Sequence, residues 1–168
     1  RERKKPLVVS ICGCKNSGKT TFIERLLPIL TQKQVKTAVV KHDGHSFEPD
    51  VEGTDSYRIR KAGACATAVF CDTHSMVVKQ KAGTVEDMLE AVDEADLVLL
   101  EGGKNWDFPK IELVRKGNSE RLAGNGRNLL AVATDIEGFQ VEKAALGTCG
   151  RVSEDGSEVP VIALDGYK

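Results

Sequence analysis

Short runs of apolar residues alternate along this chain with segments in which apolar residues recur every three or four positions. The short runs are typical of buried strands, and the three-to-four spacing is typical of helices that bury one face. The runs that predict strands span residues 7–12, 35–41, 67–71, 76–79, 97–101, 110–115, 129–135 and 160–164. The segments that predict helices span residues 18–32, 55–62 and 85–93. Because strands and helices alternate, we expect one three-layer α/β domain over residues 1–168, with a mostly parallel sheet.

Two of the predicted strands, 67–71 and 76–79, are joined by only a few polar residues. A connection this short is typical of a β-hairpin, so we expect at least one antiparallel strand in the sheet. The carboxyl ends of the parallel strands should meet at one edge, which is where open α/β sheets bind ligands. The loops after residues 12, 41, 101 and 135 should form that edge.

The loop between the first predicted strand and the first predicted helix has the sequence Gly-Cys-Lys-Asn-Ser-Gly-Lys-Thr, residues 13–20. It matches the pattern G-x-x-x-x-G-K-[ST] at each fixed position, between a strand and a helix, as this motif requires. The backbone N–H groups of such a loop and the amino end of the next helix converge on one place and bind phosphates there. Lys19 adds a positive charge, and the hydroxyl of Thr20 can ligate a Mg²⁺ ion that bridges two phosphates. The sequence therefore predicts a phosphate-loop nucleotide-binding protein.

Carboxylates follow other predicted strands at the same edge. Glu101 ends a strand of four consecutive apolar residues, and a carboxylate in that position suits the magnesium side of a phosphate-binding site. Asp43 follows the strand 35–41 and is a candidate for orienting a water molecule or for a place beside the magnesium ion. Asp135 ends the strand 129–135 in the same way.

Other polar residues near this edge leave alternatives open. His42 and His45, with the acidic residues around them, could bind a transition metal, but a cluster without a clearly spaced third ligand is more often a solvated loop. The polar segment 46–53 is a candidate switch. Three basic residues on the helix 55–62 form either a solvated helix face or an anion-binding group: Arg58, Arg60 and Lys61.

Composition narrows the class of protein. A chain of 168 residues with 40% hydrophobic content can bury a core without disulfides or metal. With 24 basic and 25 acidic residues the net charge is −1, which disfavours a protein that coats nucleic acid or a membrane surface. The five cysteines are odd in number and lie mostly in apolar runs, which fits reduced thiols in a cytoplasmic protein. The apolar run 7–12 is too short for a signal peptide or a membrane span.

A set of short blocks occurs in a specific order along the chain. The blocks are the phosphate loop 13–21, then residues 41–45, 55–58 with 60–64, 99–102 with 109–112, and 133–135. In this order they resemble the MobB family, the molybdopterin-guanine dinucleotide biosynthesis proteins B. The phosphate loop is common to many proteins, whereas the Arg-Lys-Ala-Gly-Ala and Glu-Gly…Pro-Lys-Ile-Glu blocks are specific. One departure is Gly103, where the family usually carries an aromatic residue.

The resemblance implies a GTP-binding accessory protein of molybdenum cofactor biosynthesis with weak GTPase activity. Such a protein assists a MobA-type guanylyltransferase that joins GMP to molybdopterin, and molybdopterin itself is a possible ligand. The resemblance assigns magnesium to Thr20 and Glu101, and guanine to Asp135. A carboxylate can accept hydrogen bonds from the N1–H and amino groups of guanine, whereas adenine presents an acceptor at N1; a loop-capping Asp is the competing interpretation. The resemblance assigns phosphate binding to the whole loop and the residue after it: Gly13, Cys14, Lys15, Asn16, Ser17, Gly18, Lys19, Thr20 and Thr21.

A second class of function stays open on the sequence alone. A small-molecule kinase of this type would need an arginine-bearing lid, and the glycine-rich excursion 117–128 carries Arg121 and Arg127. We also expect a homodimer, because the predicted hairpin leaves an edge strand with unpaired backbone groups. Trp106 and Phe108 either add a contact surface beside the nucleotide or pack on the protein's own core.

Overall fold

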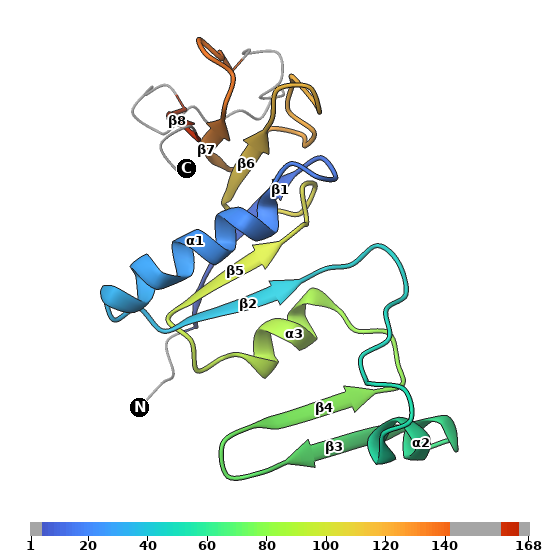
Figure 1. Ribbon diagram of the computed structural model, residues 1–168. Coiled ribbons are helices and arrows are strands. Elements are labelled where there is room, and N and C mark those ends of the chain that lie inside the picture. Colours follow the sequence, from blue (N-terminus) through green and yellow to red (C-terminus); the bar gives the residue numbers. More distant parts are fainter. Residues whose placement is uncertain (1–4, 142–158, 165–168) are drawn as a thin grey trace. The chain divides into compact units, whose positions relative to one another are not determined.

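The computed structural model describes residues 5–141 and 159–164. The chain divides into two compact units, Arg1–His42 with Leu89–Lys168, and Asp43–Met88. The elements in chain order are β1 (Leu7–Gly13), α1 (Lys19–Gln32), β2 (Thr37–Lys41), α2 (Asp55–Lys61), β3 (Ala66–Phe70), β4 (Ser75–Lys79), α3 (Val85–Ala91), β5 (Leu97–Glu101), β6 (Lys110–Val114), β7 (Leu129–Thr134) and β8 (Val161–Ala163) (Figure 1). Each predicted strand and helix is present, with ends shifted by two residues at most. The expectation of a single domain stays a prediction.

The first unit is built on a six-stranded sheet with the order β2-β5-β1-β6-β7-β8, and every neighbouring pair is parallel. The α/β class with a mostly parallel sheet and a small hairpin is confirmed. One detail is wrong: β3 and β4 pair with each other in a separate two-stranded sheet and add no antiparallel strand to the six. The physical reason is the short connection between them, which lets β3 and β4 satisfy each other's backbone groups as an antiparallel pair. A strand inside a parallel sheet is buried on both faces, whereas β3 and β4 are largely exposed.

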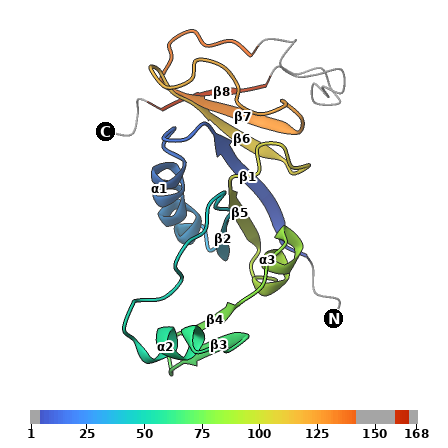
Figure 2. The ribbon, with the colours of Figure 1, turned by 90° about the vertical axis from the view of Figure 1, so that its right-hand side faces the viewer.

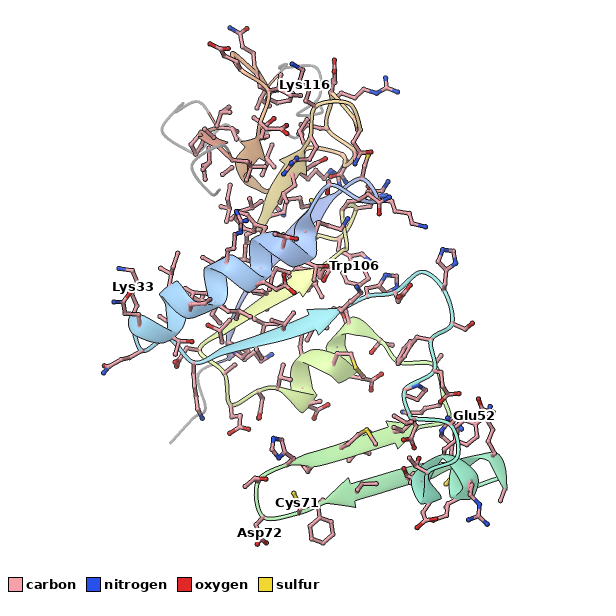
Figure 3. The ribbon with its side chains drawn as sticks, viewed as in Figure 1. Lys33, Glu52, Cys71, Asp72, Trp106 and Lys116 are labelled. Atoms are coloured by element: carbon pink, nitrogen blue, oxygen red, sulfur yellow. The ribbon has the colours of Figure 1, made fainter. Side chains whose placement is uncertain are left out.

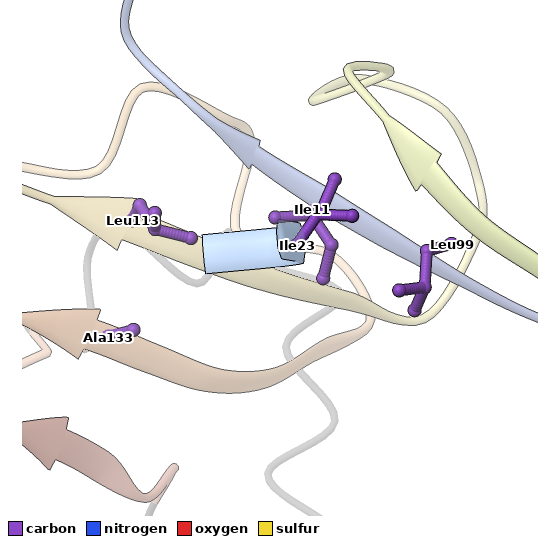
Figure 4. Close-up of a cluster of buried hydrophobic side chains, with 5 residues drawn as sticks. All are labelled: Ile11, Ile23, Leu99, Leu113 and Ala133. Carbon is purple, nitrogen blue, oxygen red and sulfur yellow. The ribbon is translucent and has the colours of Figure 1, made fainter. Parts of the chain in front are cut away.

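Helix α1 lies along one face of the six-stranded sheet (Figure 2). Its Ile23 packs against alternate residues of four strands, which face the helix because strand side chains alternate between faces. The buried cluster consists of Ile11, Ile23, Leu99, Leu113 and Ala133 (Figure 4). This packing fixes the amino end of α1 at the carboxyl end of β1, where the phosphate-binding motif lies.

The opposite face of the sheet buries polar side chains on β1 and β6. Lys110 and Glu112 are both 0% exposed. The Nζ of Lys110 donates to the carbonyls of Lys104 at 3.1 Å and Trp106 at 2.8 Å, while Oε1 of Glu112 accepts from the N–H groups of the 123–124 turn. These two side chains therefore hold the connections that precede and follow β6. Burial, together with the charge of Glu112, raises the pKa of the neighbouring Cys12 thiol to about 12, so Cys12 stays protonated.

The second unit combines α2 with the β3–β4 hairpin. The hydroxyl of Thr54 accepts from the N–H of Tyr57 at 3.3 Å and caps α2. Arg60 is buried and forms an ion pair with Glu48. Asp50 accepts from the backbone N–H of Val51 at 2.9 Å, and the hydrogen bond from Ser56 is the main reason that its pKa is lowered. The segment 46–53 is thus anchored to the start and body of α2.

Candidate nucleotide-binding site

The parallel sheet brings several loops of the first unit to one edge. The phosphate loop follows β1, Gly102 follows β5, Arg115 follows β6 and Asp135 follows β7. These strands are neighbours in the order β5-β1-β6-β7, so their carboxyl ends lie side by side. The predicted ligand edge of the first unit is therefore present in the structure.

The phosphate loop depends on two glycines with left-handed backbone. Gly13 has φ 141° and Gly18, which precedes α1, has φ 87°. A Cβ on Gly13 would lie 2.5 Å from the carbonyl oxygen of Leu113 and 2.8 Å from Oγ of Ser17, so no larger residue fits. The loop thereby turns tightly and leads directly into the amino end of α1, where the N–H groups of a helix favour an anion.

Lys19 folds back over this loop. Its Nζ donates to the carbonyl of Cys14 at 2.7 Å and to that of Gly13 at 3.3 Å. An ammonium group has three donors, so it can hold the loop and still offer a hydrogen to a phosphate oxygen. The side chain of Lys19 therefore lies over the loop from the start of α1, and its contact with phosphates stays a prediction.

Thr20 and Glu101 meet across the sheet edge. Oγ1 of Thr20 donates to Oε1 of Glu101 at 3.1 Å, and Nζ of Lys41 lies 3.4 Å from the same oxygen. Adjacent oxygens around an octahedral Mg²⁺ ion are about 3 Å apart, since each lies about 2.1 Å from the metal. A hydroxyl and a carboxylate at this separation fit two neighbouring positions on such an ion, and Glu101, 8% exposed, would supply negative charge there.

The loop after Glu101 is attached to β1 through the backbone groups of Gly102. The hydroxyl of Ser10 donates to the carbonyl of Gly102 at 2.6 Å, and the N–H of Gly102 donates to Ile11 at 3.0 Å. The indole of Trp106 packs edge-on against the ring of His42, with centroids 5.0 Å apart, and lies past the end of β5 (Figure 3).

Gly103 stands where the MobB family usually carries an aromatic residue, and the geometry around it explains why a glycine is needed here. The backbone of Gly103 has φ 65°, and a Cβ there would lie 2.3 Å from Cε3 of Trp106. The indole of Trp106 thus occupies the space that a side chain on residue 103 would need.

Asp135 is held by the segment that follows β6. Oδ1 accepts from the N–H of Lys116 at 2.8 Å, and Oδ2 lies 3.1 Å from Nε of Arg115. Sequence reasoning missed Arg115, although it directly follows a strand at the ligand edge, the same signal that selected Asp135. It also missed Asn118, whose amide donates to the carbonyl of Lys15 at 2.8 Å and ties this segment to the phosphate loop.

A cavity of about 100 Å³ opens beside the amino end of α1. The residues that line it come from α1, from β6 with the residue after it, and from the end of β8: Gly18, Thr21, Phe22, Arg25, Leu26, Ile29, Leu113, Arg115 and Leu164. Most of the side chains that line it are apolar, and Thr21, Arg25 and Arg115 add polar groups.

Two other predicted candidates, Asp43 and the His42–His45 cluster, lie in the segment that follows β2. Oδ1 of Asp43 accepts from the N–H of His45 at 3.1 Å, which is an Asx-type turn within the loop. The role of Asp43 in hydrolysis stays a prediction. Within the described residues no group of three or more His, Cys, Asp or Glu side chains could hold a metal ion, so the His42–His45 cluster gains no support as a transition-metal site.

A phosphate loop between β1 and α1 of a parallel sheet, with a buried carboxylate on the neighbouring strand, defines a nucleotide-binding protein of the phosphate-loop class. The family model of molybdopterin guanine dinucleotide synthesis protein B, MobB, matches residues 8–135. The chain belongs to this family.

Sequence relatives and solved structures also point to the MobB family. The chain is 33% identical to the molybdopterin-guanine dinucleotide biosynthesis adapter protein of Haemophilus influenzae over 93% of this chain and 85% of that protein. It is 30% identical to the Escherichia coli protein of the same name, over 77% and 78%. The crystal structure of Bacillus subtilis MobB superposes with a TM-score of 0.71 at 27% identity, over 95% of this chain and 90% of that one. The urease accessory protein UreG of Yersinia pestis is 32% identical over 60% of this chain but only 48% of its own length.

In the part of the chain that the structure describes, no helix is both long and apolar enough to cross a membrane.

Proposed function

We propose that this protein binds GTP with Mg²⁺ and acts as an adapter in molybdenum cofactor biosynthesis. In this role it assists a MobA-type guanylyltransferase as that enzyme attaches GMP to molybdopterin. The observation that carries the proposal is the arrangement at one sheet edge of the phosphate loop, the Thr20–Glu101 pair and the carboxylate of Asp135. The names of the Haemophilus and Escherichia relatives support the adapter role and the pathway.

The loop from Gly13 to Thr21 would hold the phosphates, and Thr20 and Glu101 would hold Mg²⁺. When bound, the ion would neutralise charge on the phosphates. Lys19 and the backbone N–H groups orient the same phosphates, so the chain's own residues hold the nucleotide in one orientation.

Guanine recognition falls to Asp135. Each carboxylate oxygen can accept more than one hydrogen bond, so contacts with Arg115 and Lys116 leave acceptor sites for the N1–H and amino groups of guanine. Adenine would place an acceptor against the same carboxylate and lose affinity.

Hydrolysis is a side activity in this proposal. Asp43, two residues beyond β2, is the candidate that orients the attacking water. A group that only orients water gives slow turnover unless a second cation stabilises the transition state. We therefore expect a slow GTPase. We also expect the protein to work in the cytoplasm.

The test is calorimetric titration of the whole chain with GTP, ATP and tripolyphosphate, with and without Mg²⁺. We expect GTP to bind more tightly than ATP, Mg²⁺ to strengthen both, and a purified MobA-type guanylyltransferase to bind the GTP-loaded protein. Equal affinity for GTP and ATP would overturn the proposal. Turnover faster than about one per second would instead favour the phosphotransferase alternative.

A further inference from the structure

The guanidinium of Arg115 lies between the carboxylate of Asp135 and the phosphate loop. Its Nε is 3.1 Å from Oδ2 of Asp135, and its NH1 is 3.7 Å from the position that a Cβ on Gly18 would take. We propose that Arg115 is a specificity-determining residue of the base site, which positions Asp135 for guanine and supports the base with its own guanidinium. This inference rests on the proposed function.

The first step of the argument is the orientation of the carboxylate. Arg115 contacts one oxygen of Asp135 and the backbone N–H of Lys116 contacts the other. Two fixed contacts on different oxygens stop the carboxylate from rotating, while an ionised carboxylate offers about four acceptor sites. The two remaining sites therefore have a set direction, and guanine does not have to order them on binding.

The second step is the shape of the arginine. Its Nε is used by Asp135, which leaves the two terminal nitrogens of a planar group, of which NH1 lies beside Gly18. Arg115 also lines the cavity. A planar guanidinium can pack against a flat base and hydrogen-bond at its edge at the same time. Lysine ends in a compact ammonium group, which can donate to Asp135 but has no flat face to pack against a base.

The third step is the attachment of this segment to the phosphate loop. Asn118 donates its amide to the carbonyl of Lys15 at 2.8 Å, and the N–H of Ser119 donates to the carbonyl of Arg115 at 3.2 Å. Base site and phosphate site are therefore joined by hydrogen bonds as well as by the sheet. The base-reading carboxylate is held at a fixed distance from the phosphates.

The experiment measures affinity for four probes: GTP, ITP, ATP and tripolyphosphate. ITP lacks the exocyclic amino group of guanine, so the GTP-to-ITP ratio reports the second hydrogen bond to Asp135. The variants are Arg115→Ala, Arg115→Lys, Asp135→Ala and the double variant Arg115→Ala/Asp135→Ala. Arg121→Ala is the matched control, because it removes an exposed arginine from the same segment. Circular dichroism confirms that each variant is folded.

We expect Arg115→Ala to lower GTP affinity about tenfold, the loss typical of a hydrogen bond to a charged group. The GTP-to-ITP and GTP-to-ATP ratios should fall toward one, with tripolyphosphate affinity changed less than about twofold, within the effect of an exposed charge. Arg115→Lys should rescue little. In the double variant, loss of Arg115 should lower these ratios no further than Asp135→Ala does alone.

Two results would overturn the inference while leaving the proposed function standing. In the first, wild type prefers GTP and Arg115→Ala keeps the same preference. In the second, tripolyphosphate loses as much affinity as GTP, which would make Arg115 a phosphate ligand. If wild type itself shows no preference for GTP over ATP, the proposed function fails and the inference fails with it.

Discussion

Oγ1 of Thr20 lies 3.1 Å from Oε1 of Glu101, although 81 positions separate the two residues in the sequence. The contact exists because β1 and β5 are parallel neighbours, with Ile11 opposite Glu101, so that β5 ends two residues before β1 leads into the phosphate loop. Lys41 at the end of β2 lies 3.4 Å from the same carboxylate oxygen. Helix α1 and the neighbouring strands β5 and β2 thus place a hydroxyl, a carboxylate and an ammonium group around one point beside the phosphate loop.

The first prediction concerns the motif lysine. Lys19→Ala should lower GTP affinity at least about tenfold, about 1.4 kcal/mol, because Nζ is held over the loop where the phosphates bind. Lys33→Ala is the matched control, since Lys33 is an exposed lysine at the far end of α1. Calorimetry measures both. An unchanged affinity in a folded Lys19→Ala protein would remove the phosphate assignment.

The second prediction separates the two acidic residues. Glu101→Gln keeps an oxygen acceptor for Thr20 but loses the charge, so Mg²⁺ should strengthen GTP binding about tenfold less than in wild type. Asp43→Asn should slow hydrolysis more than it weakens binding, because its proposed role is to orient water. Single-turnover assays and titrations with EDTA in place of Mg²⁺ measure the two effects. A hydrolysis rate untouched by either change rules out this division of roles.

The third prediction concerns the base. Asp135→Ala should bring the GTP-to-ATP affinity ratio close to one, while tripolyphosphate binds nearly as well as to wild type. The change also releases Arg115 and the N–H of Lys116, so Asp135→Asn serves as a second variant of nearly equal size. If Asp135→Ala keeps the full preference for GTP, another residue reads the base.

The fourth prediction concerns the turn of the hairpin, where Cys71 and Asp72 lie (Figure 3). Hydrogen bonds, the one from the hydroxyl of Thr73 first, lower the pKa of Cys71 to about 7. The thiolate fraction, and with it the rate of alkylation by iodoacetamide, should rise with pH to half its maximum near pH 7. Thr73→Ala should move that midpoint to higher pH. Peptide mass spectrometry measures the rate, and Cys12, buried and with a pKa of about 12, should stay unlabelled.

Strands and the phosphate loop could be predicted because their signals are local. The apolar runs and the eight-residue motif contain the information that fixes β1, α1 and the buried strands. The contacts of Arg115 and Asn118 could not, because they join residues that only the folded sheet brings together. The buried charges of Lys110 and Glu112 were also hidden, since a strand pattern gives no sign that loop carbonyls and N–H groups will cover them.

The β3–β4 hairpin shows a second limit of prediction from sequence. Its two strands have the right residues for a β-hairpin, but pairing inside a hairpin says nothing of whether the hairpin joins a larger sheet. In the structure β3 and β4 form their own sheet, and α2 packs on β3. Thr67 and Val78 are partly or fully covered, whereas on the opposite face Phe70 is 84% exposed and Val77 is 62% exposed.

This exposed face leads to the last prediction, that the protein is a homodimer. Phe70 and Val77 alternate with the covered residues, so the uncovered face of the two-stranded sheet presents large apolar side chains, and each strand keeps one edge without a partner in its sheet. Sedimentation of the whole chain at micromolar concentration should give twice the 18.2 kDa of one chain. The double change Phe70→Glu/Val77→Glu should shift the protein toward monomer, because two charges would face their own copies. Ile59→Glu, at an exposed apolar residue of α2 in the same unit, is the control and should leave the dimer intact. A clean monomer for wild type would refute the assembly, and a dimer that survives both glutamates would place its interface elsewhere on the molecule.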